Sequence, residues 1–190
     1  MVFFFFYTMM VSMSRGKLMI YTDGAARGNP GPAGWGVVVV KREPLALGKG
    51  PEVRHRSYQP PKREVTAEFG GKSKRATNNQ MELTAAIRAL EYAKEKNLGL
   101  PLEIYADSKY VLLGVTEWIK KWVANGWKTA AKKPVLNEEM WRELHALSED
   151  LKPTWFYVEG HSGDIYNERA DEIATAFADG LEDKINLKKP

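Results

Sequence analysis

The chain has 190 residues, a length that fits one domain with a hydrophobic core. Hydrophobic residues make up 44% of the chain and charged residues 27%, which excludes disordered, collagen-like and coiled-coil proteins. The sequence has no cysteine, so disulfide frameworks, thiolate metal sites and cysteine nucleophiles are excluded as well, and the formal net charge of +4 bears on function only where basic residues cluster.

The chain begins with an apolar stretch, residues 1–13. This stretch has no basic start and no small-x-small cleavage site, and it is too short to span a bilayer. An export signal or a membrane anchor is the alternative, but we expect an extension outside the folded core. The sequence after Met13 resembles an ordinary cytoplasmic start, so we predict a cytoplasmic location.

Three strands are predicted in the first half of the chain. Residues 18–22 form a short apolar run that ends in Asp23-Gly24, and residues 36–40 are too rich in β-branched side chains for a helix. A third strand is predicted at residues 64–70. Residues 41–75 are otherwise rich in Lys, Arg and Pro and have no long apolar run, so we expect much of this segment to be loop.

Helices and strands alternate in the second half. A helix is predicted over residues 79–96, where Leu83, Ile87 and Leu90 fall on one stripe at helical spacing. The remaining elements are a strand at 102–106, a helix at 108–123, a helix at 137–151, a strand at 154–159 and a helix at 167–179. This order predicts an α/β fold with a mixed sheet covered by helices.

Two of the predicted strands end in the same way. Residues 20–24 read Ile-Tyr-Thr-Asp-Gly, and residues 104–108 read Ile-Tyr-Ala-Asp-Ser. If the two strands are parallel neighbours, Asp23 and Asp107 lie face to face at equivalent positions. An Asp at the end of a strand is also common turn chemistry, so neither residue alone indicates a site.

Two further carboxylates lie on predicted helices. Glu82 and Asp171 are each followed by alanines at helical spacing, which lets both helices approach the sheet closely. A single acidic residue on an amphipathic helix is usually solvated. Together with Asp23 and Asp107, however, they would form an all-oxygen cluster that selects Mg²⁺ or Mn²⁺. Two such ions ~4 Å apart would clamp the attacking water and the leaving oxygen of a phosphodiester.

The motifs of this chain, in their order, resemble those of ribonuclease H type 1. The resemblance covers residues 17–180. It depends on residues 21–24 with 28–31, residues 77–83, residues 106–108, residues 118–134, and residues 160–163 with 167–171. It implies a ribonuclease H-like fold, in which three antiparallel and two parallel strands form a five-stranded mixed sheet flanked by helices.

The resemblance also implies an activity. Members of this family hydrolyse the RNA strand of an RNA/DNA hybrid and leave 5′-phosphate and 3′-hydroxyl ends. The carboxylates that match the family's site for two Mg²⁺ ions, which Mn²⁺ can replace, are Asp23, Glu82, Asp107 and Asp171. His161 matches a histidine with a role in proton transfer or product release. Without the adjoining block at 167–171, an exposed loop histidine would be the simpler interpretation.

Basic and aromatic residues cluster between Trp118 and Pro134, where no carboxylate occurs. The members of this basic segment are Lys120, Lys121, Lys128, Lys132, Lys133, Trp118, Trp122 and Trp127. Lysines neutralise phosphates and aromatic faces pack on sugars or bases, which gives a salt-dependent grip on nucleic acid. The alternative is an amphipathic helix in which Trp118 and Trp122 are core residues.

The resemblance divides the expected contacts between the two strands of a hybrid. The residues expected to bind the DNA strand and its phosphates are Arg75, Thr77, Trp118, Trp122, Lys128, Lys132, Lys133 and Asn137. The residues expected along the RNA strand are Asn29, Asn78, Asn79 and Glu82. These side chains, or the backbone beside them, suit a 2′-hydroxyl group, which is both donor and acceptor. The amides of Asn29 and Asn78 are equally suited to cap a turn.

Some features depart from the family's pattern. Gln80 and Lys109 stand where many relatives carry Arg and Gln, and the connection at 43–62 is longer than usual. The expected domain organisation is an extension at 1–13, a catalytic domain at 14–180 with an inserted loop at 43–62 and a basic protrusion at 118–134, and a C-terminal tail at 181–190. The expected partner is an RNA/DNA hybrid. We expect no membrane contact and no obligate protein partner, and we predict a monomer.

Two other functions stay open. A ribonuclease H-like DNA strand-transfer enzyme would share the sheet and an acidic triad, but not the basic segment and the His161 loop. A non-catalytic hybrid-binding protein would keep the lysines and tryptophans but would not need four carboxylates. The full set of motifs therefore favours cleavage of hybrids.

Overall fold

The computed structural model describes residues 16–44 and 61–189. The predictions for residues 1–13, and most of those for the insertion at 43–62, lie outside these residues. The cytoplasmic location depends on residues 1–13 and stays a prediction. Within the described ranges, no helix is both long enough and apolar enough to cross a membrane.

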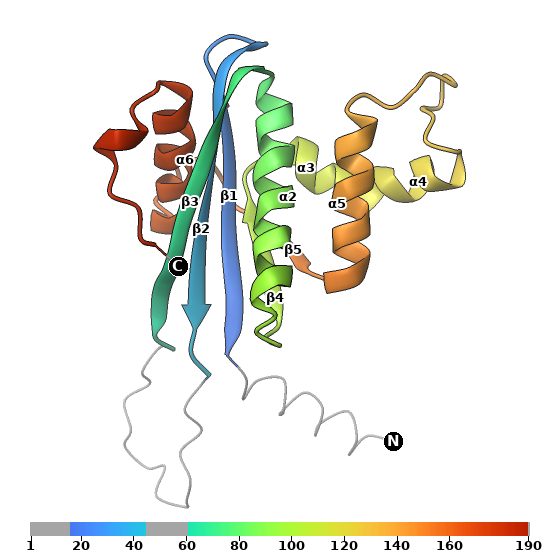
Figure 1. The fold of residues 1–190 in the computed structure, drawn as a ribbon. Coiled ribbons are helices and arrows are strands. Elements are labelled where there is room, and N and C mark those ends of the chain that lie inside the picture. Colours follow the sequence, from blue (N-terminus) through green and yellow to red (C-terminus); the bar gives the residue numbers. More distant parts are fainter. Residues whose placement is uncertain (1–15, 45–60, 190) are drawn as a thin grey trace, which may run out of the picture.

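Five strands form one mixed sheet in the order β3-β2-β1-β4-β5 (Figure 1). Their bounds are β1 Lys17–Ala26, β2 Gly31–Arg42, β3 Arg63–Ala76, β4 Leu102–Ala106 and β5 Thr154–Tyr157. β2 pairs antiparallel with both β1 and β3, whereas β4 runs parallel to β1 and β5 runs parallel to β4. This arrangement confirms the predicted fold.

Helices cover both faces of the sheet (Figure 1). The helical segments are α2 Asn78–Lys96, α3 Lys109–Leu113, η1 Gly114–Trp118, α4 Ile119–Ala124, α5 Glu138–Leu151, α6 Ile165–Ala178 and η2 Glu182–Lys184. Helix α2 packs on one face of β1 and β2, and α6 packs on the opposite face of the same strands. Helix α5 packs against α2. The strand β1 is therefore enclosed between two helices.

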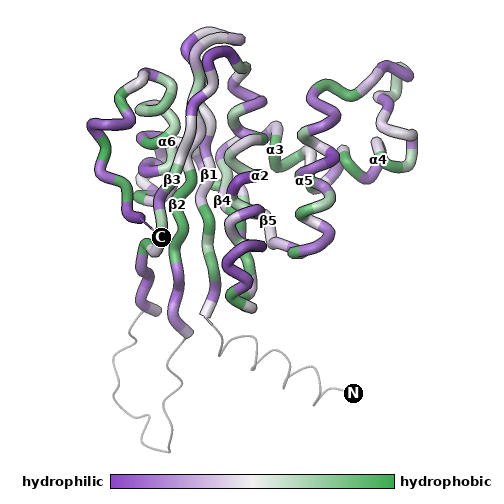
Figure 2. Tube along the Cα trace, viewed as in Figure 1, coloured by the Kyte–Doolittle hydropathy of each residue, from purple (hydrophilic) through white to green (hydrophobic). Residues whose placement is uncertain are grey.

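Side chains of the central strands alternate between the two faces. On the α2 side, Ile20 belongs to a core cluster with Leu83 and Leu90. On the α6 side, Tyr21 belongs to a second cluster with Ile173. Because both faces are covered, the central strands read as nearly continuous apolar runs. Figure 2 shows these hydrophobic stretches of the sheet between the helices.

The first three strands are longer than the sequence predicts. The strand predicted at 64–70 is confirmed, but β3 spans Arg63–Ala76, so the expectation of loop is wrong for residues 71–75. β3 is an edge strand in which positions such as Lys72 and Lys74 are exposed, so it pairs with β2 without an apolar run. The apolar pattern that predicts a strand is therefore missing from much of β3.

The helix predicted at 108–123 is interrupted. The structure divides it into α3, the π-helical turn η1 and α4. The turn begins at Gly114, where an added Cβ would lie 2.0 Å from the indole ring of Trp141. The π-helical turn thus coincides with a close contact between Gly114 and Trp141, which are far apart in the sequence. The periodicity of residues 108–123 alone does not predict this turn.

The C-terminal residues pack onto the sheet edge. The backbone N–H of Glu68 in β3 donates to the carbonyl of Lys188 at 2.7 Å, and the N–H of Lys188 donates to the Glu68 carboxylate at 2.9 Å. Ile185 and Leu187 pack against the core cluster on the α6 face. Residues 185–188 therefore extend the packed structure beyond the predicted end of the domain at residue 180.

Candidate active site

The ends of β1 and β4 bring two carboxylates together. The two strands are parallel neighbours, and their register pairs Ile20 with Ile104 and Tyr21 with Tyr105. The echoed motifs therefore lie side by side, as the sequence predicts. The next carboxylates along both strands, Asp23 and Asp107, emerge at the same edge of the sheet.

Glu82 reaches this edge because α2 lies unusually close to β1. At Gly24 an added Cβ would lie 2.3 Å from the backbone nitrogen of Glu82, so a larger residue would push the helix away. One oxygen each from Glu82, Asp23 and Asp107 lies within 4.8 Å of the others. The structure thus joins three of the four predicted carboxylates in one cluster.

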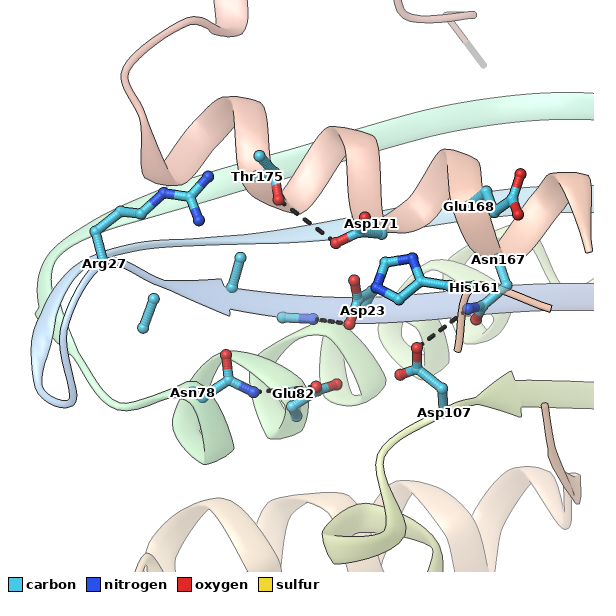
Figure 3. A pocket seen from close by; sticks show the side chains of 13 residues that line it. Asp23, Arg27, Asn78, Glu82, Asp107, His161, Asn167, Glu168, Asp171 and Thr175 are labelled. Atoms are coloured by element: carbon cyan, nitrogen blue, oxygen red, sulfur yellow. Dashed lines mark hydrogen bonds between the residues drawn. The ribbon is translucent and has the colours of Figure 1, made fainter. Parts of the chain in front are cut away.

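Asp171 comes from the opposite face of the sheet. Its helix α6 packs tightly on β2, where a Cβ at Gly36 would lie 2.3 Å from the carbonyl oxygen of Ala170. Asp171 accepts a hydrogen bond from the Thr175 hydroxyl at 3.4 Å. It lines the same pocket of about 260 Å³ as the three clustered carboxylates (Figure 3).

Burial and mutual repulsion raise the pKa of two carboxyls in the pocket. Asp23 is 6% exposed, and burial together with the charge of Asp107 raises its pKa to about 8, although the Gly24 N–H donates to it at 2.8 Å. Burial, Asp23 and Asp107 also raise the pKa of Glu82 well above its ordinary value. Oε2 of Glu82 is buried and has no hydrogen-bond partner among the described residues. This all-oxygen set, with an unpartnered carboxylate oxygen, fits a hard divalent cation.

His161 also lines the pocket. It lies in the loop between β5 and α6, where its side chain is exposed and its backbone is left-handed, with φ 55°. In Figure 3 the imidazole lies between the carboxylates of Asp171 and Asp107. The loop therefore brings the predicted histidine to the predicted carboxylates.

Four polar residues of the pocket are absent from the residues predicted for the site: Arg27, Asn167, Glu168 and Thr175. Asn167 is 2% exposed and donates from Nδ2 to Oδ2 of Asp107 at 3.1 Å. The sequence does contain a signal for Asn167 and Thr175, because both lie four residues from Asp171 and share its face of the helix. Arg27 has no such periodic relation to the site.

The asparagines predicted along the RNA strand lie where the β1–β2 turn meets the start of α2. Asn29 accepts a hydrogen bond from the backbone N–H of Asn78 at 3.2 Å. The Asn78 side chain donates to Oε1 of Glu82 at 3.4 Å and lines the pocket. Asn79 is exposed at the first turn of the helix and does not line the pocket.

The three residues predicted to hold a DNA phosphate lie at element ends. Arg75 is exposed near the end of β3, and Thr77 caps α2 by accepting a hydrogen bond from the Gln80 N–H at 3.3 Å. Asn137 precedes α5 and donates to the Tyr110 hydroxyl at 3.2 Å. None of the three lines the pocket.

The basic segment projects from the sheet with α4 and the loop that follows it (Figure 1). The rings of Trp118 and Trp122 lie 5.8 Å apart, and Trp122 also lies 5.5 Å from Trp141. Both Trp118 and Trp122 are only partly buried, so each ring packs on its neighbours and still has an accessible face. Trp127, by contrast, is a core residue. The lysines of the segment are exposed at 120, 121, 128, 132 and 133.

Known proteins match this chain over most of its length. The model of the RNase H family matches residues 15–179. A ribonuclease H of Thermosynechococcus vestitus is 46% identical over 161 residues, which are 85% of this chain and 88% of that protein. A ribonuclease H of Ruthia magnifica is 42% identical over 165 residues, which are 87% of this chain and 97% of that protein.

A solved structure shares the fold. LC11-RNase H1, crystallised in complex with an RNA/DNA hybrid, matches with a TM-score of 0.54 and 27% identity over 86% of this chain and 98% of that chain. The mixed sheet, with acidic side chains gathered at the ends of β1 and β4, places the protein among enzymes of ribonuclease H-like fold. With the matches above, it follows that the chain belongs to the ribonuclease H family, and it is an endonuclease of the hydrolase class.

Proposed function

We propose that this protein hydrolyses the RNA strand of RNA/DNA hybrids in a reaction that depends on two divalent cations and leaves 5′-phosphate and 3′-hydroxyl ends. The observation that carries the proposal is the convergence of Asp23, Glu82 and Asp107, whose oxygens lie within 4.8 Å of one another in a pocket that Asp171 and His161 also line. The complex of LC11-RNase H1 with a hybrid supports the choice of substrate. All these residues come from one chain, so no second subunit is needed to assemble them. We propose that the enzyme acts as a monomer without an obligate protein partner.

The four carboxylates would hold the cations. Carboxylate oxygens select Mg²⁺, with Mn²⁺ as a substitute. Two ions bound here would supply positive charge at the attacking water and at the leaving oxygen. Asn78 and Asn167 donate to Glu82 and Asp107, so they fix the direction of these two carboxylates.

His161 would handle a proton at the leaving oxygen or assist the departure of the product. An imidazole can both accept and donate a proton, which suits either task. Its exposure on a loop supports a role that involves movement, because the loop holds the ring beside the pocket without burying it. The carboxylates, by contrast, belong to strands and helices or directly follow them.

Asn29, Asn78 and Asn79 would recognise the RNA strand. Each side-chain amide is both a donor and an acceptor, as a 2′-hydroxyl is. Asn29 and Asn78 are joined by a hydrogen bond, and Asn78 reaches Glu82, so these amides adjoin the cluster that performs the cut. Glu82 would accept from a 2′-hydroxyl in the same region. This adjacency would restrict cleavage to a strand that carries 2′-hydroxyls.

Arg75, Thr77 and Asn137 would hold a phosphate of the DNA strand. The Thr77 oxygen accepts the capping hydrogen bond of α2, and its own hydrogen is still available to a phosphate oxygen. Asn137 uses one amide hydrogen on Tyr110, which orients the group and leaves the second hydrogen. The guanidinium of Arg75 would add a charge-assisted contact.

The basic segment would extend this grip along the DNA strand. Trp118 and Trp122 each have a packed side and an accessible side, which supports contact with sugars or bases. Lys128, Lys132 and Lys133 are exposed on the loop beyond α4, where they would neutralise phosphates. Binding through these residues would be salt-dependent and largely independent of sequence.

The experiment that tests the proposal compares three duplexes of the same sequence: an RNA/DNA hybrid, duplex DNA and duplex RNA, each with one labelled strand. With Mg²⁺, we expect cleavage of the RNA strand of the hybrid alone, and no cleavage in EDTA. The RNA fragments should carry a 5′-phosphate, and the 3′-hydroxyl should accept extension by a polymerase. Joined DNA products would instead indicate strand transfer, and tight binding of hybrid without any cut would indicate a binding protein.

A further inference from the structure

Arg27 stands apart from the other residues of the pocket. Among the residues that the structure describes, it is the only Lys or Arg that lines the pocket, whose charged walls are otherwise acidic except for His161. It is the first residue after β1, and Figure 3 shows it at one end of the pocket, with Asp107 near the other end. The positively charged guanidinium in this position would lie beside any polyanion that enters the pocket.

The backbone of Arg27 is held firmly although its side chain is half exposed. The Arg27 N–H donates to the carbonyl of Pro32 across the turn at 2.7 Å. Gly31 packs so closely beneath it that an added Cβ would lie 2.0 Å from the Arg27 carbonyl oxygen. The base of the side chain is therefore fixed relative to β1 and Asp23.

The guanidinium is also oriented by a single acidic partner, Asp179. Nε of Arg27 donates to Oδ1 of Asp179, and Nη2 donates to Oδ2 at 2.7 Å, which is a bidentate pair. The hydrogen bond from Arg27 lowers the pKa of Asp179, so both groups are charged at neutral pH. Asp179 is the C-cap of α6, where the helix dipole disfavours an acid, so helix stability does not account for an acidic residue there.

The pair leaves donors of Arg27 available. A guanidinium has five N–H groups, and two of them serve Asp179. The side chain is 47% exposed and lines the pocket, so it has N–H groups that neither Asp179 nor burial occupies. A phosphate could therefore bind without displacing Asp179.

We propose that Arg27 binds a phosphate of the strand being cut, next to the scissile one, and that Asp179 is the positioning residue that aims its guanidinium. This inference rests on the proposed function, because the strand that enters the carboxylate pocket is the RNA strand. The asparagines at 29, 78 and 79 would read the 2′-hydroxyls of that strand, and Arg27 would fix its phosphate register. The acidic pocket would thereby gain a fixed positive charge for an anionic substrate.

The test uses Arg27→Ala, Arg27→Lys and Asp179→Asn in the full chain, with hybrid cleavage measured at several salt concentrations. Arg27→Ala should raise KM about tenfold, since a charge-assisted contact is lost, and should lower the slope of log affinity against log salt by about 0.7–0.9. Arg27→Lys keeps the charge, so it should keep the slope while KM rises less. Asp179→Asn should raise KM a few-fold and leave the slope unchanged, because the Arg27 guanidinium keeps its charge but loses its orientation.

Arg88→Ala is the matched control. Arg88 is 52% exposed, forms an ion pair with Glu91 at 2.7 Å, and does not line the pocket. Its loss removes the same charge and a similar ion pair, so KM and the salt slope should equal those of the wild type.

Two results would overturn the inference while the proposed function stands. If wild type cleaves the hybrid and Arg27→Ala has wild-type KM and salt slope, Arg27 does not bind the strand. If Arg27→Ala changes only the Mg²⁺ concentration for half activity, with KM unchanged at saturating Mg²⁺, Arg27 merely offsets the carboxylate charge. Failure of the wild type to cleave any hybrid would instead refute the proposed function itself.

Discussion

Asp23 and Glu82 are acids that the folded chain buries without compensating their charges. The pKa of Asp23 rises to about 8 from an ordinary 3.8, and that of Glu82 also rises well above its usual range. When the pKa of an acid is higher in the folded state than in the unfolded state, the acid makes its full contribution to stability only below its unfolded-state pKa. For Asp23 this contribution is present below pH 3.8 and is lost as the pH rises through about 8. The metal-free protein should therefore lose stability across this interval.

Asp23→Asn should remove that loss together with the proposed metal site. In EDTA, we expect the variant to melt at a higher temperature than the wild type at pH 8, by a difference in unfolding free energy on the order of a few kcal/mol. The gain should be smaller at pH 5. Calorimetry at both pH values measures it, with the exposed Asp150→Asn as a control. Equal melting temperatures for wild type and Asp23→Asn at pH 8 would show that the buried charge has no such effect.

Cation binding should depend on pH for the same reason. A divalent cation needs ionised carboxylates, so it must displace the proton that Asp23 holds below about pH 8, and it competes with protonation of Glu82, whose pKa burial also raises. The apparent Kd for Mg²⁺ should fall as the pH rises from 6.5 to 8, by about tenfold per unit for each proton released. Titration calorimetry in two buffers with different ionisation enthalpies counts the protons. A Kd that is constant over this range would contradict the proton displacement.

At the scale of elements, the basic segment is separated from the carboxylates. It lies on α4 and the following loop, whereas the pocket is built from β1, α2, α6 and the segment after β4. Groups that bind substrate far from the reacting atoms act about equally on the ground state and the transition state. The segment should therefore set affinity without altering the chemical step.

Replacement of Lys128, Lys132 and Lys133 with Ala tests this division. We expect a higher KM and a salt slope reduced by up to ~3 units, with kcat at saturating hybrid nearly unchanged. The matched control replaces three exposed lysines at the C-terminal ends of α2 and α5, Lys94, Lys96 and Lys152, and should leave the slope as it is. If the variant without Lys128, Lys132 and Lys133 keeps wild-type affinity and salt dependence, these lysines do not bind the hybrid.

The sequence predicts the elements where one local pattern decides them. The echo of β1 in β4 predicts that Asp23 meets Asp107 if the two strands are parallel neighbours, and the structure pairs them in this way. Contacts between distant segments have no such pattern. The π turn at Gly114 coincides with a close contact to Trp141, and Arg27 is oriented by Asp179, which is 152 residues away.

The C-terminal segment, residues 185–188, packs across β3 and α6. Glu68 of β3 bonds to Arg169 of α6 and to the N–H of Lys188, and the backbone of Asn186 accepts from Arg169. Burial opposes ionisation of Glu68, but these bonds outweigh it and lower the pKa of its carboxyl. The segment thus covers the outer edge of β3 and ties α6, which carries Asp171, to the sheet.

A chain that ends at Lys184 should therefore be less stable. Loss of the partly buried Ile185 and Leu187 and of the bonds to Lys188 should lower the unfolding free energy by about 2–3 kcal/mol, as measured with urea. Since no residue of the pocket is removed, kcat at 25 °C should stay near that of the wild type. Removal of residues 189–190 alone is the control. Unchanged stability after the longer truncation would mean that the segment contributes nothing to the fold.

Four segments, far apart in the sequence, bring their carboxylates into one pocket, and we propose that the cations held there promote cleavage of RNA within a hybrid. The most direct measurement is the single-turnover rate of RNA-strand cleavage in Mg²⁺ for wild type and Asp107→Asn, with hybrid affinity measured for both. Asn is nearly isosteric with Asp and keeps the fold, so we expect near wild-type affinity with a rate lowered by at least about 10³-fold, on the order of 4 kcal/mol. Substantial Mg²⁺-dependent cleavage by Asp107→Asn would contradict the role of the Asp107 carboxylate in cleavage.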